Sequence, residues 1–258
     1  MDRRSLGRSG LDITPVGFGT FKLGRNEGTK YPDGYDIPSD EEASLMLNGV
    51  LDLGLNILDT APAYGCSEER IGRILSKRRS EFVLCTKAGE QWAEGGSHYD
   101  FSPSAVRASL EGSLERLQVD HVDILLIHSD GRDLEHQADG LLPGLLQALR
   151  DEGKAGLIGF SGKSPEGITA AIAWSDVVML EYNYQEQGME ESIRRAADHG
   201  VGVLVKKGLG SGHLDAARAL EFLLRDAPVK DAISSTIIGS RSLERMAMNV
   251  ALADELLG

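Results

Sequence analysis

The chain has 258 residues and a formal net charge of −13, from 40 acidic and 27 basic side chains. This length is close to the roughly 250 residues typical of an eightfold β/α barrel, and we expect a single domain over residues 1–258. A chain this acidic is a poor binder of nucleic acid or anionic membranes, so we expect no partner of either kind. An anionic ligand would need a local basic site.

The sequence carries no signal of export or membrane insertion. Cys66 and Cys85 form no CxxC motif, and no apolar run approaches the ~20 residues of a membrane span. The first four residues lead into Gly-rich sequence without the apolar stretch of a secretory signal. We therefore expect a reduced, cytoplasmic protein, either a monomer or a small homo-oligomer.

Short apolar runs rich in Val, Ile and Leu alternate with helical segments along the chain. Before the first run, residues 4–14 predict a small β-hairpin that would plug the N-terminal end of a barrel. Near-continuous apolar runs are typical of parallel strands covered on both faces. The predicted strands are Val16–Gly19, Asn56–Thr60, Phe82–Lys87, Asp123–His128, Leu157–Ser161, Val177–Tyr182, Val201–Lys206 and Ile233–Gly239.

A helix is predicted after each strand. Ser39 and Glu42 indicate a capping box at the start of the first helix, which Gly54 ends. Ser102 and Pro103 are typical of an N-cap followed by proline at the first helical position. The other helices are predicted around 71–75 and over Asp139–Glu152, Pro165–Trp174, Met189–His199, Leu214–Asp226 and Leu243–Leu256.

Eight strand–helix units indicate a (β/α)8 barrel, the TIM-barrel architecture of the α/β class. The rival is an open, doubly wound sheet, which usually carries GxGxxG after its first strand. Neither Gly17–Phe21 nor Gly208–Gly212 matches that motif, so we expect the closed barrel. The long polar segments 22–38 and 89–101 follow strand ends, where the catalytic loops of barrels lie.

Ionisable side chains end three successive predicted strands, namely Asp59, Lys87 and His128. Such residues inside apolar strands must be paired or functional. Asp59 and Lys87 also fit a buried structural ion pair, His128 a satisfied histidine at the rim, and Tyr64 ordinary loop packing. Their occurrence together on successive units favours an active site at the carboxyl ends of the strands.

Several motifs resemble those of the aldo-keto reductase family, over about residues 4–253. Residues 58–65 (LDTAPAYG), followed by Ser67 and Glu68, resemble the family signature. Thr86-Lys87 and Ile127-His128 are similar to the next two motifs, and Gly17–Thr20 to the first strand. Residues 237–241 (IIGSR), with Arg245 and Asn249, resemble the segment that binds the cofactor phosphate.

The resemblance implies an NADPH-dependent enzyme that reduces an aldehyde or ketone, or runs in reverse, with NADH as the alternative cofactor. Tyr64 would be the general acid that protonates the carbonyl oxygen as hydride arrives from the nicotinamide. Lys87 would lower the pKa of Tyr64, Asp59 would hold the lysine, and His128 would orient the substrate.

The cofactor would lie along the strand ends and the start of the last helix. Free N–H groups at a helix N-terminus favour an anion, and Arg241 and Arg245 suit a 2′-phosphate, although both also fit a solvated surface. The predicted cofactor-binding residues are Gly19, Thr20, Phe21, Asp59, Ser161, Gly162, Met179, Lys206, Lys207, Leu209, Ser211, Gly239, Ser240, Arg241, Arg245 and Asn249.

Three positions depart from the family pattern. Gly162 stands where Asn commonly follows Ser161, Met179 replaces a Gln, and Lys206 replaces the aromatic residue that often stacks on the nicotinamide. The nicotinamide would thus lose partners, and Lys206 or Lys207 would contact the pyrophosphate instead. We expect an open substrate pocket for small or aromatic aldehydes, or for a sugar lactol, walled by Phe21, Tyr64, Trp92 and Ser129.

Two other functions fit the same sequence. A Schiff-base lyase on this barrel would use Lys87, Lys206 or Lys207 as its nucleophile. A non-catalytic, nucleotide-sensing subunit would fit the altered nicotinamide contacts. The six histidines show no HxH or HExxH pairing, so we expect no metal site.

Overall fold

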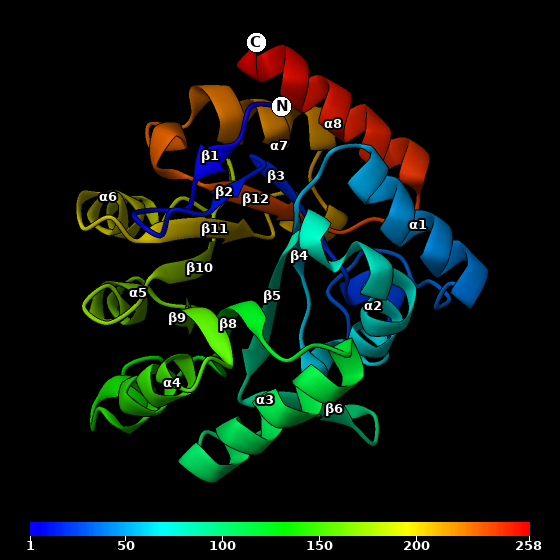
Figure 1. Cartoon of the computed structure of the whole chain (residues 1–258). Helices are drawn as coiled ribbons and strands as arrows, with labels where there is room; N and C mark the ends of the chain where they lie inside the picture. Colours follow the sequence, from blue (N-terminus) through cyan, green and yellow to red (C-terminus); the bar gives the residue numbers. More distant parts are fainter.

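Eight parallel strands form a closed barrel in the computed structural model, which describes residues 1–258 (Figure 1). The barrel closes where β12 pairs with β3, with Ile237 opposite Gly17, so the open-sheet alternative is excluded. The strands are β3 (Val16–Gly19), β4 (Ile57–Asp59), β5 (Val83–Ala88), β8 (Val122–His128), β9 (Ala155–Ser161), β10 (Val177–Glu181), β11 (Gly202–Lys206) and β12 (Ser235–Ile238).

Helices surround the barrel on its outer side (Figure 1). The predicted capping box at Ser39 and Glu42 is present, and the Ser102 hydroxyl caps the helix that begins at Pro103. The helices are α1 (Asp40–Asp52), α2 (Ser67–Leu75), α3 (Pro103–Leu117), α4 (Leu141–Asp151), α5 (Pro165–Ala171), α6 (Glu190–Asp198), α7 (Ala216–Glu221) and α8 (Leu243–Leu257). None of them is long and apolar enough to cross a membrane.

The predicted N-terminal hairpin is present as β1 (Arg4–Ser5) and β2 (Asp12–Ile13), paired antiparallel. Leu6 and Ile13 are fully buried in a cluster with side chains from inside the barrel, including Ile124. Leu6 packs so closely on Gly202, the first residue of β11, that a side chain there would collide with it. The hairpin therefore closes the N-terminal end of the barrel and leaves the opposite mouth open for a site.

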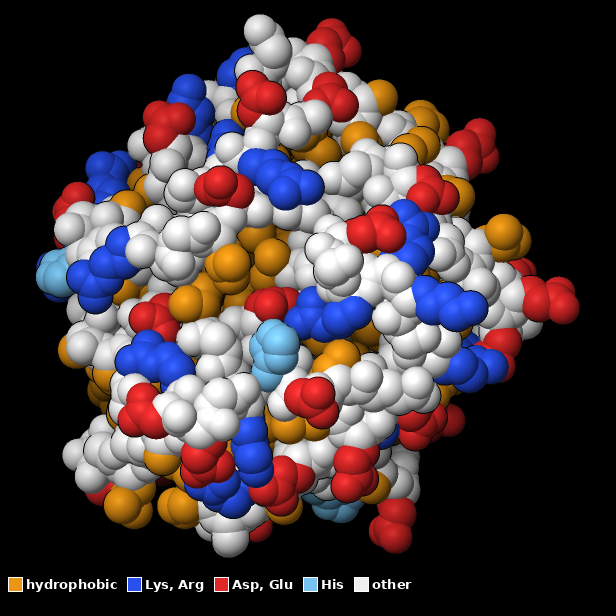
Figure 2. Space-filling view, viewed as in Figure 1, with side chains coloured by type: hydrophobic (Ala, Val, Ile, Leu, Met, Phe, Trp, Pro, Cys, Tyr) orange, Lys and Arg blue, Asp and Glu red, His pale blue; other side chains and the backbone are white.

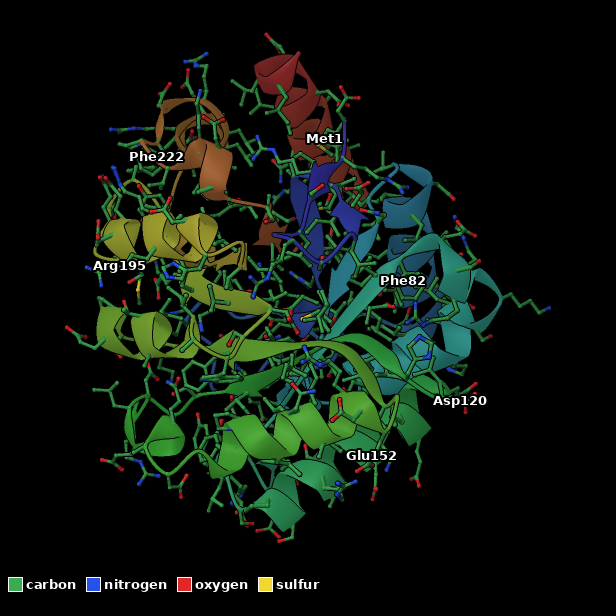
Figure 3. The ribbon with its side chains drawn as sticks, turned by 60° about the vertical axis from the view of Figure 1, so that its left-hand side comes forward. Met1, Phe82, Asp120, Glu152, Arg195 and Phe222 are labelled. Carbon is green, nitrogen blue, oxygen red and sulfur yellow. The ribbon has the colours of Figure 1, made fainter.

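Apolar side chains fill the layer between strands and helices, as the stick view shows (Figure 3). The N-terminus lies beside α8, where the Met1 ammonium pairs with Asp254 at 2.6 Å (Figures 1 and 3). On the face drawn in Figure 2, acidic and basic side chains are interspersed and do not gather into one basic patch.

The structure differs from the prediction mainly at the ends of elements and in one loop. The fifth helix, predicted to run to Trp174, ends at Ala171, and the Trp174 indole N–H instead donates to Gln137 Oε1 at 2.9 Å. Residues 89–101, predicted as a loop, contain an antiparallel pair, β6 (Glu90–Ala93) and β7 (Gly96–Tyr99). This hairpin stands beside the mouth of the barrel and contributes a site residue.

Candidate active site

The carboxyl ends of β4, β5 and β8 bring the predicted ionisable residues together. Lys87 Nζ lies 2.6 Å from Asp59 Oδ1 and also donates to Thr60 O at 2.9 Å and to Tyr64 Oη at 3.2 Å. An ammonium has three N–H groups, so these three acceptors use all of them. With Lys87 only 1% exposed, the carboxylate that neutralises it is a physical necessity.

Tyr64 is placed by a short helical turn, Pro62–Tyr64, that follows β4. Two glycines let this turn pack directly against the loop after β3. A Cβ atom at Gly24 would lie 2.2 Å from the Tyr64 carbonyl oxygen, and one at Gly65 would lie 2.1 Å from the Gly24 carbonyl oxygen. Gly65 also has a φ of 59°, which favours glycine. Backbone contact between two loops therefore fixes the phenol over Lys87.

The charges of this group follow from burial and from their pairing. Burial opposes the charged form of Lys87, but Asp59, together with Tyr64 and Cys85, outweighs that effect and raises the lysine pKa above its usual value. Burial raises the pKa of Tyr64, and Lys87 opposes this shift without cancelling it. Lys87 therefore does lower the pKa of Tyr64 as expected, but burial raises it by more, so the pKa lies above its usual value. Tyr64 keeps its proton at neutral pH.

His128 faces a residue that the sequence analysis did not single out. Its Nδ1 lies 2.8 Å from Oε2 of Glu90, the first residue of β6, although the two are not aligned as a normal hydrogen bond. Burial raises the pKa of Glu90, but the adjacent His128 imidazole and a hydrogen bond from Ser97 outweigh it and bring the pKa to about 2. Burial lowers the pKa of His128, with Glu90 opposing, so the imidazole is neutral at pH 7. The position of Glu90, an acidic residue just after the end of β5, was the signal in the sequence that could have identified it.

Part of the family-like motif is structural. Glu68 is fully buried, accepts a hydrogen bond from Thr86 Oγ1 at 2.5 Å and pairs with Arg116 at 2.8 Å. Ser67 Oγ donates to the Thr20 carbonyl oxygen at 2.7 Å. These bonds tie α2 to β5, α3 and the end of β3, and so hold the frame around Tyr64.

Lys206 ends β11 and Lys207 follows it, but the two lysines have different partners. Lys206 Nζ donates to Ser161 Oγ at 2.8 Å, reaching from β11 across β10 to β9. Lys207 pairs with the Glu181 carboxylate. Met179, predicted as a cofactor contact, is only 1% exposed and belongs to the apolar cluster inside the barrel. The structure thus brings Ser161 and Lys206 together at the mouth, with Met179 in the floor.

Contacts with Asp133 account for the positions of Ser129 and Gly162, which lie near the end of β9. Its carboxylate accepts hydrogen bonds from the Lys163 and Ser164 backbone at 2.8 and 2.7 Å, and from the Ser129 hydroxyl. Ser129, predicted to wall the pocket, is therefore buried and engaged in the loop. A Cβ at Gly162 would lie 3.1 Å from Asp133 Oδ2 and 2.8 Å from Ile168, so a side chain would be crowded there.

A cleft of about 760 Å³ lies at the N-terminus of α8. Six of the predicted cofactor residues line it, namely Leu209, Gly239, Ser240, Arg241, Arg245 and Asn249. Lys22, which the sequence analysis did not select, contributes a third cation from the end of β3. Burial, followed by repulsion from Arg241 and Arg245, lowers the pKa of Lys22. A basic cleft at a helix N-terminus fits the phosphates of a dinucleotide, in a protein that is otherwise acidic.

Aromatic side chains border the mouth on the side of the loop after β3. Phe21 meets Tyr64 edge to face at 5.1 Å between ring centroids. The Arg25 guanidinium lies 3.3 Å from the Trp92 ring centroid, which joins this loop to the β6–β7 hairpin. Phe21 and Trp92 are both partly exposed, as side chains that wall a pocket must be.

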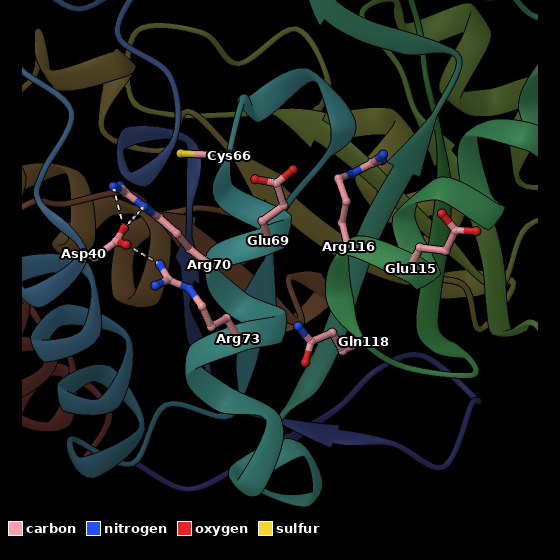
Figure 4. A pocket seen from close by; sticks show the side chains of 8 residues that line it. All are labelled: Asp40, Cys66, Glu69, Arg70, Arg73, Glu115, Arg116 and Gln118. Atoms are coloured by element: carbon pink, nitrogen blue, oxygen red, sulfur yellow. Dashed lines mark hydrogen bonds and ion pairs between the residues drawn. The ribbon is translucent and has the colours of Figure 1, made fainter.

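A second hollow, of about 500 Å³, lies outside the barrel over α2 and α3 (Figure 4). Its three arginines are neutralised locally, because Arg70 and Arg73 both pair with Asp40, and Arg116 pairs with Glu68. These ion pairs hold the surrounding helices together, and none of the strand-end residues lines the hollow.

Known proteins share this barrel fold. Their similarity in sequence places the chain in a class of oxidoreductases. The chain belongs to the aldo/keto reductase family, whose sequence model matches residues 15–222. It is 29% identical to L-galactose dehydrogenase of Arabidopsis thaliana, over 99% of this chain and 81% of that protein.

It is also 26% identical to the NADH-specific methylglyoxal reductase of Escherichia coli, over 83% of this chain and 69% of that protein. The crystal structure of a Pseudomonas aeruginosa protein assigned to the aldo-keto reductases is 38% identical and superimposes with a TM-score of 0.90. The superposition covers 99% of this chain and 95% of the Pseudomonas aeruginosa chain.

Proposed function

We propose that this enzyme transfers hydride between NADPH and an aldehyde or ketone, or in reverse from an alcohol, with Tyr64 as the proton donor. The observation that carries the proposal is the contact of Lys87 Nζ with both Asp59 Oδ1, at 2.6 Å, and Tyr64 Oη, at 3.2 Å. Because the lysine donates to the phenol oxygen, the phenol proton is free to point toward a substrate oxygen.

Each residue of the set has a task in this chemistry. The nicotinamide, when bound, supplies or accepts the hydride, which no side chain can do. Tyr64 donates its proton to the carbonyl oxygen during reduction, and Lys87 stabilises the phenolate that remains. Asp59 keeps Lys87 protonated and in place. His128 meets Tyr64 edge to face, with 6.2 Å between ring centroids, where it can orient the substrate.

The substrate is a small or aromatic carbonyl compound, or a sugar lactol for the reverse reaction. Phe21, Tyr64 and Trp92 supply apolar walls around the proton donor, whereas the buried Ser129 hydroxyl is directed to Asp133. For the cofactor, the cleft holds Lys22, Arg241 and Arg245 beside one carboxylate, Glu244. Because guanidinium groups match the geometry of phosphate oxygens, the two arginines favour NADPH, with its 2′-phosphate, over NADH.

Tyr64→Phe is the test of this proposal. Wild-type enzyme and variant are titrated with NADPH and NADH by nucleotide fluorescence, then assayed on aromatic, dicarbonyl and sugar substrates. We expect the variant to bind NADPH with wild-type affinity and to lose at least about a hundredfold in kcat, because it lacks the proton donor. A variant with wild-type turnover would refute the assignment of Tyr64. Nucleotide binding by the wild type without turnover on any carbonyl would favour the sensing subunit.

A Schiff-base lyase is a second candidate, supported by one observation. Lys206 has a hydroxyl as its hydrogen-bond partner and no carboxylate, and burial followed by repulsion from Lys207 lowers its pKa to about 7. Such an amine can act as a nucleophile, whereas Lys87 is held protonated by Asp59. Borohydride trapping of a carbonyl substrate on Lys206 without nucleotide, with no NADPH oxidation, would favour the lyase.

A further inference from the structure

Lys206 is the lysine of the mouth that lacks an anionic partner. Lys87 is paired with Asp59, and Lys207 is paired with Glu181. The Lys206 ammonium instead reaches only the neutral Ser161 hydroxyl, at 2.8 Å. A partly buried cation without a counter-charge interacts strongly with any charge that enters its surroundings.

The charged groups around Lys206 are mostly cations. Those that influence its titration are Lys207 beside it, Lys87 on β5, Lys163 on the loop after β9 and, with opposite sign, Asp133 on the loop after β8. Lys206 in turn disfavours the protonated form of His128 on β8. Glu181 on β10, the register neighbour of Lys206, is already neutralised by Lys207. Only Asp133 offsets part of this positive charge, and no carboxylate forms an ion pair with Lys206.

The amine also lies beside the reacting groups. Its partner Ser161 is the register neighbour of His128, so Lys206 extends across the mouth toward the catalytic side. On the proposed function, on which this inference rests, the nicotinamide must enter the mouth to reach a carbonyl held at Tyr64. A ring that reaches a carbonyl there would come near the Lys206 amine, because Lys206 is bonded to Ser161 beside His128.

We propose that Lys206 makes the mouth select the reduced form of the nicotinamide over the oxidised form. The oxidised ring carries a positive charge and the reduced ring carries none, whereas the rest of the dinucleotide is the same in both. An ammonium beside the ring repels only the oxidised form, so it weakens binding of the oxidised product after reduction.

The preference depends on pH with a defined sign. Burial, together with the neighbouring cations, lowers the pKa of Lys206 to about 7 in the free enzyme. Below that pH the amine is charged and opposes the oxidised ring; above it the amine is neutral and the repulsion disappears. Binding of NADP⁺ near neutral pH must also expel the proton from Lys206, because two adjacent positive charges are unfavourable.

Isothermal titration calorimetry of the wild-type enzyme with NADP⁺ and with NADPH tests the proposal. We expect the ratio Kd(NADP⁺)/Kd(NADPH) to fall roughly tenfold between about pH 6 and pH 8.5, as Lys206 loses its charge. Titrations in buffers of different ionisation enthalpy should show proton release on NADP⁺ binding near pH 7 that is larger than for NADPH.

Three variants separate the amine from its surroundings. Lys206→Met should give a low ratio that does not change with pH, and Lys206→Arg should keep a high ratio up to about pH 8.5 because arginine stays charged. Lys77→Met removes the same charge from an exposed position in the turn after α2 and should leave the ratio within about twofold of wild type.

The outcomes are distinct. Equal weakening of both nucleotides by Lys206→Met would mean that the amine contacts the shared phosphates, and would overturn the proposal. A ratio that is independent of pH in the wild type, or unchanged in Lys206→Met, would overturn it as well. Failure of the wild type to bind either nucleotide would instead refute the proposed function.

Discussion

At the scale of single residues, the site depends on which charges are paired and which are not. Lys87 has an acceptor for each of its three N–H groups, and its charge is fixed by Asp59. Removing either partner would leave an uncompensated charge in the barrel, which typically costs about 3–5 kcal/mol. Lys206, in contrast, has a hydroxyl in place of a carboxylate, which leaves its charge free to respond to pH and to ligands.

The pH dependence of reduction follows from the direction of the Tyr64 shift. Burial raises the pKa of Tyr64 above its usual value of 10, and Lys87 opposes this only in part. A proton donor must be protonated, so a raised pKa keeps it active as the pH increases. We expect kcat/KM for aldehyde reduction at saturating NADPH to show no loss up to about pH 9. A basic limb with an apparent pKa between about 7 and 8, in enzyme shown to stay folded, would contradict this direction.

The sequence predicts the four central residues because each ends a strand or follows a distinctive motif. It does not predict Glu90, since pairing of His128 with a carboxylate on a separate hairpin depends on tertiary structure. It also selects Ser129 as a pocket residue, which the structure turns toward Asp133. A strand-end position specifies which end of the barrel a residue occupies, but not the partner that its side chain finds.

At the scale of elements, the two loops that follow β3 and β4 form one unit around Tyr64. Gly24 and Gly65 permit backbone contact between them, and Ser67 adds a hydrogen bond to Thr20 O. The chain thus holds Tyr64 from both sides. Its position depends on glycine at 24 and 65, because a side chain at either residue would push the two loops apart.

Gly24→Ala should displace Tyr64 from Lys87. The added methyl group would lie 2.2 Å from the Tyr64 carbonyl oxygen and 2.4 Å from the Ser67 nitrogen, so the turn must move. We expect kcat to fall by at least about tenfold, because small displacements of a catalytic group are costly. Gly34→Ala in the same loop is the matched control, since nothing lies within 4 Å of its added carbon. Equal activities of the two variants would show that this contact does not position the tyrosine.

Strands are predicted well and the β6–β7 hairpin is not, for one physical reason. The barrel strands are covered on both faces, so they are mostly apolar until they reach the mouth. The hairpin is exposed on much of its surface, and its four-residue strands carry no periodic apolar pattern. Its turn uses Glu94 and Gly95 at positive φ, a signal of a turn but not of the strands around it.

At the scale of the whole molecule, the packing that closes the barrel and the groups that react lie at opposite ends. The hairpin β1–β2 closes one end, and the reacting groups occupy the other. The molecule is acidic as a whole, but three cations gather at the cleft beside α8, where an anionic cofactor would bind. Chain length, composition and the alternation of apolar strands with helices suffice to predict this architecture, because the barrel needs that alternation along the whole chain.

Leu6→Ala should therefore reduce stability without reducing activity. Leu6 is fully buried against the interior of the barrel, and deletion of a buried leucine side chain costs about 2–5 kcal/mol. We expect a lower Tm by thermal unfolding, and a kcat unchanged at temperatures where the variant is folded. Leu45→Ala, at a position that is 70% exposed, is the matched control and should leave Tm nearly unchanged. A loss of kcat in folded Leu6→Ala would show that the two ends are coupled.

The most direct test of the central claim follows the hydride itself. NADPH deuterated at the transferred C4 position is incubated with an aldehyde substrate, and the label in the alcohol is measured by mass spectrometry for wild type and Tyr64→Phe. We expect one deuterium per product molecule from the wild type, and labelling at least about a hundredfold slower from the variant at saturating nucleotide. Product without deuterium, or labelling by the variant at the wild-type rate, would contradict the account of this site.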